Sequence, residues 1–336
     1  MTPDALRYEA LPIQRLTPAH LAAWATMIAA NDELRSPFFH PDYALTVGAE
    51  RDGIEVCVLL ERDVPVGFFP FERLDGGIGR PVGGSMSNFQ GMIAPPGLRW
   101  NAEQLVRAAG LRTLKFHHQL CSQTELDRFA TQRANSPYMD LGAGWSAYVE
   151  ARRAAGVKRF NALPREIRRL EREVGPLRFT PHASEATAFE TLISWKVAQY
   201  ERTGVKGSLQ QAWSLAVLRR LAASRDGAVR GMLSTLHSGD RLVAVHLGIH
   251  SATELHYWYP TYDPEVARHS PGLILLHEIG RWCAEHGIAR INLGKGESQY
   301  KDWFGSATVL VGVGQVDVPV RVSLLRRIGR RILRRS

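Results

Sequence analysis

Apolar residues recur along this chain with two periods, and together they predict alternating helices and strands. Thr17 and Pro18 suit a helix N-cap and first helical position, and apolar residues at helical spacing follow them. Apolar runs at 54–60 and 65–73 flank a charged turn and predict a buried β-hairpin. The same patterns predict helices over 101–110, 144–174, 185–201, 213–224 and 270–286, and strands over 113–116, 229–237, 241–250, 254–259, 288–293 and 309–316.

The order of these elements is similar in the two halves of the chain. Arg51-Asp-Gly precedes a strand, a turn and a second strand, and Arg225-Asp-Gly precedes the same series later. Arg-Asp-Gly is a common turn sequence, but the shared order of helix, hairpin, helix and strand favours a duplicated α/β fold. Residues 76–97, rich in Gly, Pro, Ser and Asn, predict a long loop that contacts or covers another part of the protein.

Length and composition are those of a globular protein with room for two domains. The chain has 336 residues, of which 45% are hydrophobic and 22% charged, which excludes disordered and fibrous classes. Its three cysteines lie far apart and offer neither a disulfide framework nor a zinc-binding spacing, so we expect no metal site and a reducing compartment. Neither a signal peptide nor an apolar run of membrane-spanning length is seen, so we expect a cytoplasmic location.

The net charge of +9 is unevenly distributed. Residues 321–336 contain seven arginines and no acidic residue, and residues 151–175 contain eight basic and three acidic residues. The remainder therefore carries a small net negative charge, which argues against a nucleic-acid-binding surface over the whole protein.

The predicted strand 241–250 has one apolar face and one face of small residues and histidines. With a period of two, Val245 and Leu247 share the first face, and His246 and Gly248 share the second. One interpretation is a half-exposed sheet face that carries two histidines. The other is a cleft in which His246 accepts a proton or contacts a substrate, because a histidine titrates near neutral pH.

Two segments after this strand contain chemically suggestive residues. Aromatic residues at 257–262 lead to Asp263, and Ser270-Pro-Gly then begins a helix whose backbone N–H groups suit an anion such as pyrophosphate. The strand at 288–293 ends in a glycine-containing loop, and Tyr300, Lys301 and Trp303 follow. Lys301 suits a phosphate or a developing negative charge, the alternative being a solvated surface lysine.

These segments together resemble a known family. Their order resembles the C-terminal domain of CelD-like acetyltransferases of the GNAT superfamily. The resemblance rests on a strand hairpin, then Tyr-Trp-Tyr-Pro-Thr-Tyr-Asp, then His-Ser-Pro-Gly with its helix, and last Gly-Lys-Gly-Glu-Ser-Gln-Tyr-Lys-Asp-Trp-Phe. That group is associated with cellulose and exopolysaccharide biosynthesis and is similar to the Fem-type aminoacyl transferases. The resemblance implies an α/β fold of two tandem GNAT-like domains with mixed central sheets flanked by helices. We expect an N-terminal domain at 1–143, a C-terminal domain with the catalytic site at 144–318 and a basic tail at 319–336.

The resemblance also implies N-acyl transfer from acyl-CoA, either acetyl-CoA or a longer thioester, to an amine of a small molecule or an envelope or exopolysaccharide precursor. In such a reaction a neutral amine attacks the thioester carbonyl, a base removes its proton and backbone N–H groups polarise the carbonyl oxygen. The candidate site residues are His246 or Asp263 as base, Tyr300 for the leaving thiolate, Lys301 as a further catalytic group, Arg268, Ser270, Pro271 and Gly272 for the pyrophosphate, and Tyr259, Tyr262 and Trp303 for the substrate.

Two other functions stay open at this stage. Arg268-His-Ser-Pro-Gly departs from the usual glycine-rich phosphate turn of GNAT proteins, which suits a non-catalytic scaffold or a Fem-like donor such as aminoacyl-tRNA. In the tRNA case the basic stretch 151–175 is the RNA-binding element, although its glutamates also suit pairing with neighbouring arginines. The tail 321–336 reads either as a basic amphipathic helix for the inner face of an anionic membrane or as a disordered end.

Overall fold

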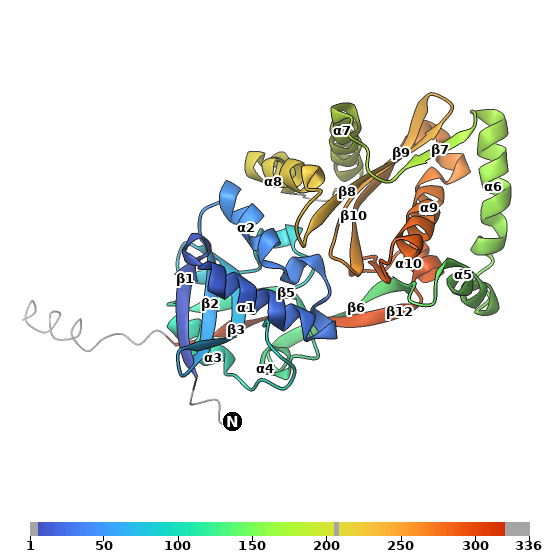
Figure 1. Cartoon of the computed structure of the whole chain (residues 1–336). Helices are drawn as coiled ribbons and strands as arrows, with labels where there is room; N and C mark the ends of the chain where they lie inside the picture. The colour runs from blue at the N-terminus through green and yellow to red at the C-terminus, as the bar shows by residue number, and fades with distance from the viewer. Residues whose placement is uncertain (1–5, 205–207, 320–336) are drawn as a thin grey trace, which may run out of the picture.

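The hairpin at 54–73 belongs to a sheet that runs through the whole structure (Figure 1). The computed structural model describes residues 6–204 and 208–319, and all twelve described strands join one mixed sheet in the order β1-β2-β3-β4-β5-β12-β6-β11-β10-β9-β8-β7. Residues 320–336, which include nearly all of the predicted tail, lie outside the described residues.

Each half of the chain has the same ten elements in the same order. In the first half they are β1 (Arg7–Pro12), α1 (Pro18–Ala29), α2 (Pro41–Glu50), β2 (Ile54–Glu61), β3 (Val64–Leu74), β4 (Ile78–Arg80), α3 (Ala102–Ala108), β5 (Thr113–Leu120), α4 (Thr124–Asp127) and β6 (Ala130–Asp140). In the second half they are β7 (Leu177–Thr180), α7 (Ala186–Thr203), α8 (Ala212–Ala223), β8 (Arg230–Ser238), β9 (Arg241–His250), β10 (Glu254–Tyr262), α9 (Pro271–Glu285), β11 (Arg290–Asn292), α10 (Gln299–Phe304) and β12 (Ala307–Asp317). The predicted duplication of an α/β unit is therefore confirmed.

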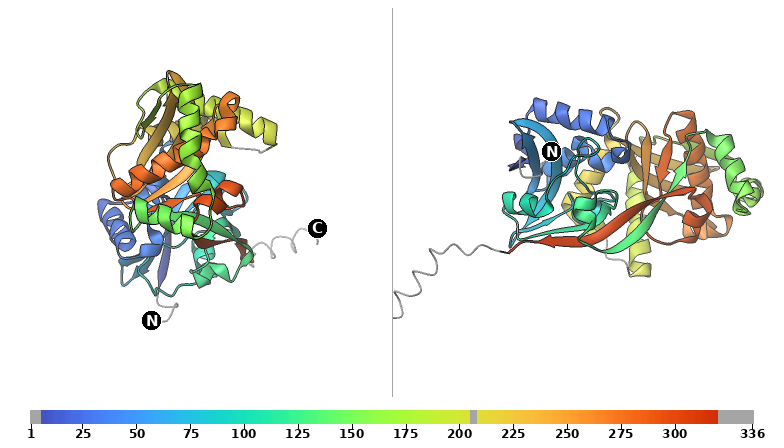
Figure 2. Two further views of the ribbon diagram at one scale, coloured as in Figure 1. Left: turned by 90° about the vertical axis from the view of Figure 1, so that its right-hand side faces the viewer. Right: turned by 90° about the horizontal axis from the view of Figure 1, so that it is seen from below.

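The two halves exchange their last strands. β6, from the first half, pairs with β11 of the second, and β12, from the second half, pairs with β5 of the first. The exchanged strands also pair with each other along almost their full length, which joins the two half-sheets into one (Figure 2). Because each half is completed by a strand of the other, the expected division at 143/144 stays a prediction.

Helices cover both faces of the sheet, and three apolar cores lie beneath them. One core joins the two halves: it contains Trp24 of α1, Tyr43 of α2, Leu192 of α7 and Leu218 of α8. Separate cores lie beneath α3 in the first half and beneath α9 in the second. α9 thus lies on the opposite face of the sheet from α7 and α8 (Figure 1).

Most predicted elements are confirmed, and the differences are informative. Thr17 caps α1 by accepting a hydrogen bond from the His20 N–H. The predicted helix at 144–174 is two helices, α5 (Trp145–Ala154) and α6 (Arg159–Glu173), because Gly156 adopts a left-handed conformation between them. β1, α2, β4, α4, β6 and β7 were not predicted. Short 3₁₀ turns lie at 13–15, 32–34, 37–39, 84–86, 208–210 and 264–269.

No helix in the ranges 6–204 and 208–319 is long and apolar enough to cross a membrane.

The packing of α8 on β8 yields a stability prediction. A Cβ atom at Gly231 would lie 1.8 Å from the carbonyl oxygen of Leu221, a backbone atom that cannot move aside without shifting the helix. We therefore expect Gly231→Ala to lower the free energy of unfolding by about 3 kcal/mol in urea titration. The control is Gly142→Ala, whose Cβ would meet only the Asp140 carboxylate, at 3.3 Å. Equal unfolding midpoints for the two variants would contradict the packing.

Candidate active site

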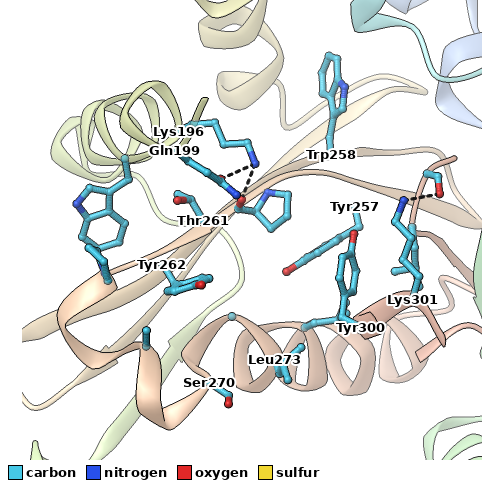
Figure 3. Close-up of a pocket in the computed structure, with 18 of the residues that line it drawn as sticks. Lys196, Gln199, Tyr257, Trp258, Thr261, Tyr262, Ser270, Leu273, Tyr300 and Lys301 are labelled. Carbon is cyan, nitrogen blue, oxygen red and sulfur yellow. Dashed lines mark hydrogen bonds between the residues drawn. The ribbon is translucent and has the colours of Figure 1, made fainter. Parts of the chain in front are cut away.

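A cavity of about 800 Å³ opens where β10 and β11 separate (Figure 3). The two parallel strands pair over only three residues and part after His256 and Asn292. β10 continues to Tyr262, whereas the chain after β11 turns away into the loop that carries Gly294. The cavity therefore lies between α7, the second part of β10, the start of α9 and the residues before α10.

β10 carries a bulge at the edge of this cavity. The pairing of β10 with β9 shifts between His256 and Tyr259, so that Tyr257 and Trp258 together oppose the single residue Gly248. A bulge leaves backbone groups unpaired and turns side chains out of the regular alternation. Tyr257 and Trp258 both line the cavity, so the bulge supplies its floor.

The start of α9 forms one wall of the cavity. Ser270 precedes the helix in the left-handed conformation with φ of 55°, and both Ser270 and Gly272 line the cavity. Pro271 has no N–H group, and the N–H of Leu273 donates to the Ser270 carbonyl at 3.0 Å. The N–H of Gly272 is thus the first-turn donor left for a ligand. A Cβ atom at Gly272 would lie 3.2 Å from the Tyr262 ring, so the absence of a side chain keeps this end open.

The lining of the cavity is cationic. Lys196, Arg202, Lys295 and Lys301 line it together with His256, and no aspartate or glutamate is among its lining residues in the described part of the chain. Four cationic groups without a carboxylate around one cavity favour a ligand with several negative charges. This composition is the strongest chemical signal in the site.

Lys196 is held by two acceptors in a mostly apolar setting. It lies on α7 with 8% of its surface exposed, and its Nζ donates to the Pro260 carbonyl and to Gln199 Oε1, both at 3.0 Å. Burial lowers the pKa of this ammonium group to about 8. A neutral lysine amine has two N–H donors and one lone pair, so the two acceptors satisfy the neutral form completely and leave the lone pair available.

Lys301 stands at the other end of the cavity in a similar arrangement. Its Nζ donates to the Gly294 carbonyl at 2.9 Å and to the Lys295 carbonyl at 2.8 Å, which fixes the loop after β11. Burial also lowers its pKa to about 8. Figure 3 shows Lys196 and Lys301 on opposite sides of the two tyrosines that occupy the middle, Tyr257 and Tyr300.

Tyr300 lies on α10 with its ring 6.3 Å from that of Tyr257. Burial raises its pKa to about 12, so its hydroxyl keeps its proton throughout the neutral range. A protonated hydroxyl on the cavity wall is suited to donate to an oxygen or sulfur atom of a ligand.

The first half of the chain contributes Asn88 to this cavity. Asn88 lies in the segment 76–97, and its Nδ2 donates to His256 Nε2 at 2.7 Å. The expectation that this loop contacts another part of the protein is therefore confirmed. Burial and the charge of Lys301 lower the pKa of His256 to about 3, so that its ring is neutral and accepts the hydrogen bond.

Comparisons with known proteins agree with this geometry. Residues 157–302 match the family described as the acetyltransferase (GNAT) domain, and this segment includes most of the cavity. Within the second half, residues 157–302 are therefore similar to a GNAT domain. Comparison with curated protein sequences gives no match.

Solved structures show the same fold over nearly the whole chain. FemX matches with a TM-score of 0.57 and 10% identity, over 95% of this chain and 99% of FemX. The C-terminal DUF2156 domain of an Agrobacterium fabrum protein described as a lysylphosphatidylglycerol synthetase matches with a TM-score of 0.54 and 12% identity, over 93% and 95% of the two chains. A tandem GNAT protein from the clavulanic acid biosynthesis pathway matches with a TM-score of 0.53 and 11% identity, over 94% and 99%. At these identities the likeness concerns the fold alone.

Five of the predicted site residues meet in the cavity where β10 and β11 separate or at its rim. Ser270, Gly272, Tyr262, Tyr300 and Lys301 line the cavity, and Pro271 lies between two of them in the first turn of α9. Their individual roles stay predictions.

The two predicted bases lie outside the lining of this cavity. His246 is fully buried, and its ring stacks on that of Tyr257 with ring centroids 4.4 Å apart. Tyr257 therefore separates His246 from the cavity. Burial and the positive charge of nearby Lys196 lower the pKa of His246 to about 3. Asp263 begins the turn before α9, where it accepts from the Glu265 N–H and pairs with Arg241 at 2.6 Å. Neither residue is among those that line the cavity.

Three other residues that were predicted to contact a ligand also lie outside the lining of this cavity. Arg268 is 67% exposed and pairs with Glu173 at the end of α6, away from the cavity lining. Tyr259 is buried in the core that joins the two halves. Trp303 packs beneath the Arg159 guanidinium, whose carbon lies 5.0 Å from the ring.

Lys196 and Asn88, which also line this cavity, were not predicted from the sequence. Lys196 falls at a position where the helical period of α7 predicts an apolar core residue, and a lysine at such a position is itself a signal. Asn88 gives no comparable signal, because its place depends on how the first half packs on the second. Among residues 6–204 and 208–319, no group of three or more histidine, cysteine, aspartate or glutamate side chains is suited to a metal ion.

Proposed function

We propose that this protein is an N-acyltransferase that uses acyl-CoA as donor and an amine as acceptor. The observation that carries the proposal is the cavity at the β10/β11 separation, with its four cationic side chains and no carboxylate. Coenzyme A carries three phosphate groups, which such a lining complements. The GNAT match over residues 157–302 supports the same donor class.

The start of α9 is the proposed pyrophosphate site. The Gly272 N–H and the positive end of the helix dipole favour an anion here, and the open space beside Tyr262 admits it. The acyl carbonyl then lies near the β10 bulge, where unpaired backbone groups are suited to polarise its oxygen.

Lys196 is the proposed proton acceptor. Its neutral form has both N–H groups satisfied by Pro260 and Gln199, and its lone pair is free to take a proton as the acceptor amine forms the new amide bond. With a pKa of about 8, roughly a tenth of Lys196 is neutral at pH 7. The C–S bond of the thioester breaks as the amide forms, and Tyr300, which lines the cavity, is the proposed proton donor to the departing sulfur.

The acceptor class is proposed from the family resemblance. An amine of a small molecule or of an envelope or exopolysaccharide precursor fits an N-acyltransferase of this kind. Contact of the tail 321–336 with an anionic membrane and a cytoplasmic location stay part of this proposal.

A thiol-release assay tests the function. Acyl-CoA thioesters of increasing chain length are incubated with a panel of amines, and free thiol and amide product are measured together. We expect thiol release that depends on both protein and amine. If no thioester is bound in calorimetry and none reacts, the proposal fails.

The pH dependence of the reaction follows from the pKa of Lys196. Below pH 8 the neutral fraction of Lys196 rises with pH, so kcat at saturating donor should rise about tenfold per pH unit and level off above pH 8. The slope should disappear in Lys196→Met, measured on its residual rate. A wild-type rate that is flat between pH 6 and 8 would exclude Lys196 as the base.

A second candidate is transfer from aminoacyl-tRNA. The fold of FemX matches this chain, and α6 exposes Arg165, Arg168 and Arg172 on the outside of the second half. Four other charged residues on this helix are paired: Arg159 with Glu166, and Arg169 with Glu173. This function predicts tRNA binding that weakens steeply with salt and is lost when the three exposed arginines are replaced by glutamine.

A further inference from the structure

A second cavity lies at the far end of α9, away from the proposed catalytic cavity. The main cavity is lined by Gly272 and Leu273 at the start of this helix, whereas the second is lined by Trp282 and by His286 just past its end. Ten residues of helix separate Gly272 from Trp282, a rise of about 15 Å. The second cavity has a volume of about 290 Å³ and is therefore a separate site.

This cavity has a basic lining. Its charged and titratable lining residues are Arg225, Arg230, His182, His250 and His286, and no aspartate or glutamate lines it in the described part of the chain. They come from four places in the fold: the loop before α7, the α8–β8 connection, the end of β9 and the end of α9. Segments that are far apart in the sequence thus bring basic side chains together around this second cavity.

The guanidinium groups in this cavity keep hydrogen-bonding capacity for a ligand. Arg225 donates through Nη1 to the carbonyls at the end of α8, the shorter contact being to Ala222 at 2.5 Å. Arg230 donates through Nε to the Gly227 carbonyl at 3.1 Å. Within the described residues neither forms an ion pair with a carboxylate, so each can direct its remaining N–H groups at an anion.

The imidazole rings are held in place around an aromatic wall. Trp282 stacks on His286 with ring centroids 4.1 Å apart and meets His182 edge-on at 5.1 Å. His250 Nδ1 is bonded to the Ser251 carbonyl at 2.8 Å. Burial lowers the pKa of both His182 and His250, and the positive charges of Arg225 and Arg230, respectively, add to this effect.

We propose that this cavity is a binding site for a small phosphate-bearing anion, either inorganic phosphate or a phosphate monoester. Two guanidinium groups match the geometry and charge of a tetrahedral dianion. A volume of about 290 Å³ admits a phosphate with a small organic group but not a nucleotide-sized ligand with its full substituents. The site is independent of the proposed acyl transfer.

Histidine NMR provides a local test. The ring proton signals of His182, His250 and His286 are assigned with single His→Gln variants and followed as inorganic phosphate or glycerol 3-phosphate is added to the full chain. We expect saturable shifts at millimolar concentrations. Phosphate binding alone supports a site for the free ion, and tighter binding of glycerol 3-phosphate supports a monoester site.

Two variants decide whether the shifts report this cavity. Arg230→Gln removes one guanidinium, and Ala252→Glu places a carboxylate at an exposed turn residue that lines the cavity. Each should weaken binding about tenfold or more. Two controls should bind phosphate as the wild type does: Arg219→Gln, an exposed arginine paired with Glu190, and Lys196→Met in the main cavity. No saturable shift with either probe, or equal affinity in both cavity variants and the wild type, would overturn the proposal.

Discussion

Replacing Lys196 with methionine should lower kcat for acyl transfer by about 100-fold or more while leaving donor binding nearly unchanged. Methionine has similar length and fills the same mostly buried space, so the fold should be kept, but it has no lone pair that accepts a proton at neutral pH. The measurement is amine-dependent thiol release with an acceptor that the wild type uses, alongside calorimetric titration with the same thioester.

A matched variant separates the role of Lys196 from that of the positive charge of the cavity. Arg202 lines the same cavity from the same helix but is exposed, so Arg202→Gln should weaken donor binding by a few-fold and leave kcat close to the wild-type value. If Lys196→Met and Arg202→Gln lose the same modest factor in kcat, Lys196 contributes charge only.

Tyr300→Phe should lower kcat by about 100-fold with little change in the KM for acyl-CoA. Burial raises the pKa of Tyr300 to about 12, so the hydroxyl is available as a proton donor across the whole neutral range, and phenylalanine removes only that hydroxyl. Single-turnover measurement of thiol release gives the rate of the chemical step directly.

The neighbouring ring offers the control for this variant. Tyr257 lines the cavity with its ring 6.3 Å from that of Tyr300, and Tyr257→Phe removes a hydroxyl from the same cavity. We expect Tyr257→Phe to lose less than tenfold. The assignment of Tyr300 to the leaving sulfur fails if the two phenylalanine variants are equally slow, or if both retain the wild-type rate.

Local signals in the sequence predicted the local parts of this fold. The apolar runs around residues 62 and 239 gave the hairpins β2–β3 and β8–β9, and Ser270-Pro-Gly gave the start of α9. The strand β7 is too short to show a hydrophobic period. The exchange of β6 and β12 is decided by pairing between distant segments, which no window of the sequence contains.

The difference between local signals and long-range packing also explains which parts of the candidate site could be predicted from the sequence. Tyr300 and Lys301 follow a strand end in sequence, so their place beside the cavity could be predicted from local order. His246 was correctly placed on the strand face opposite Val245, but the stacking of Tyr257 over its ring depends on the bulge in β10. Arg268 suited a phosphate by its neighbours in sequence, yet Glu173 of α6 holds it at 3.0 Å. Tertiary packing decided each of these cases.

The most direct test of the central claim is equilibrium binding of acyl-CoA to the main cavity. Gly272→Phe places a ring at the start of α9, inside the cavity, and Glu285→Phe places the same ring at an exposed position on the same helix. Native mass spectrometry and calorimetry should show one bound CoA thioester in the wild type and in Glu285→Phe, and none in Gly272→Phe. Absence of any bound thioester in the wild type, or undiminished binding in Gly272→Phe, would contradict the account.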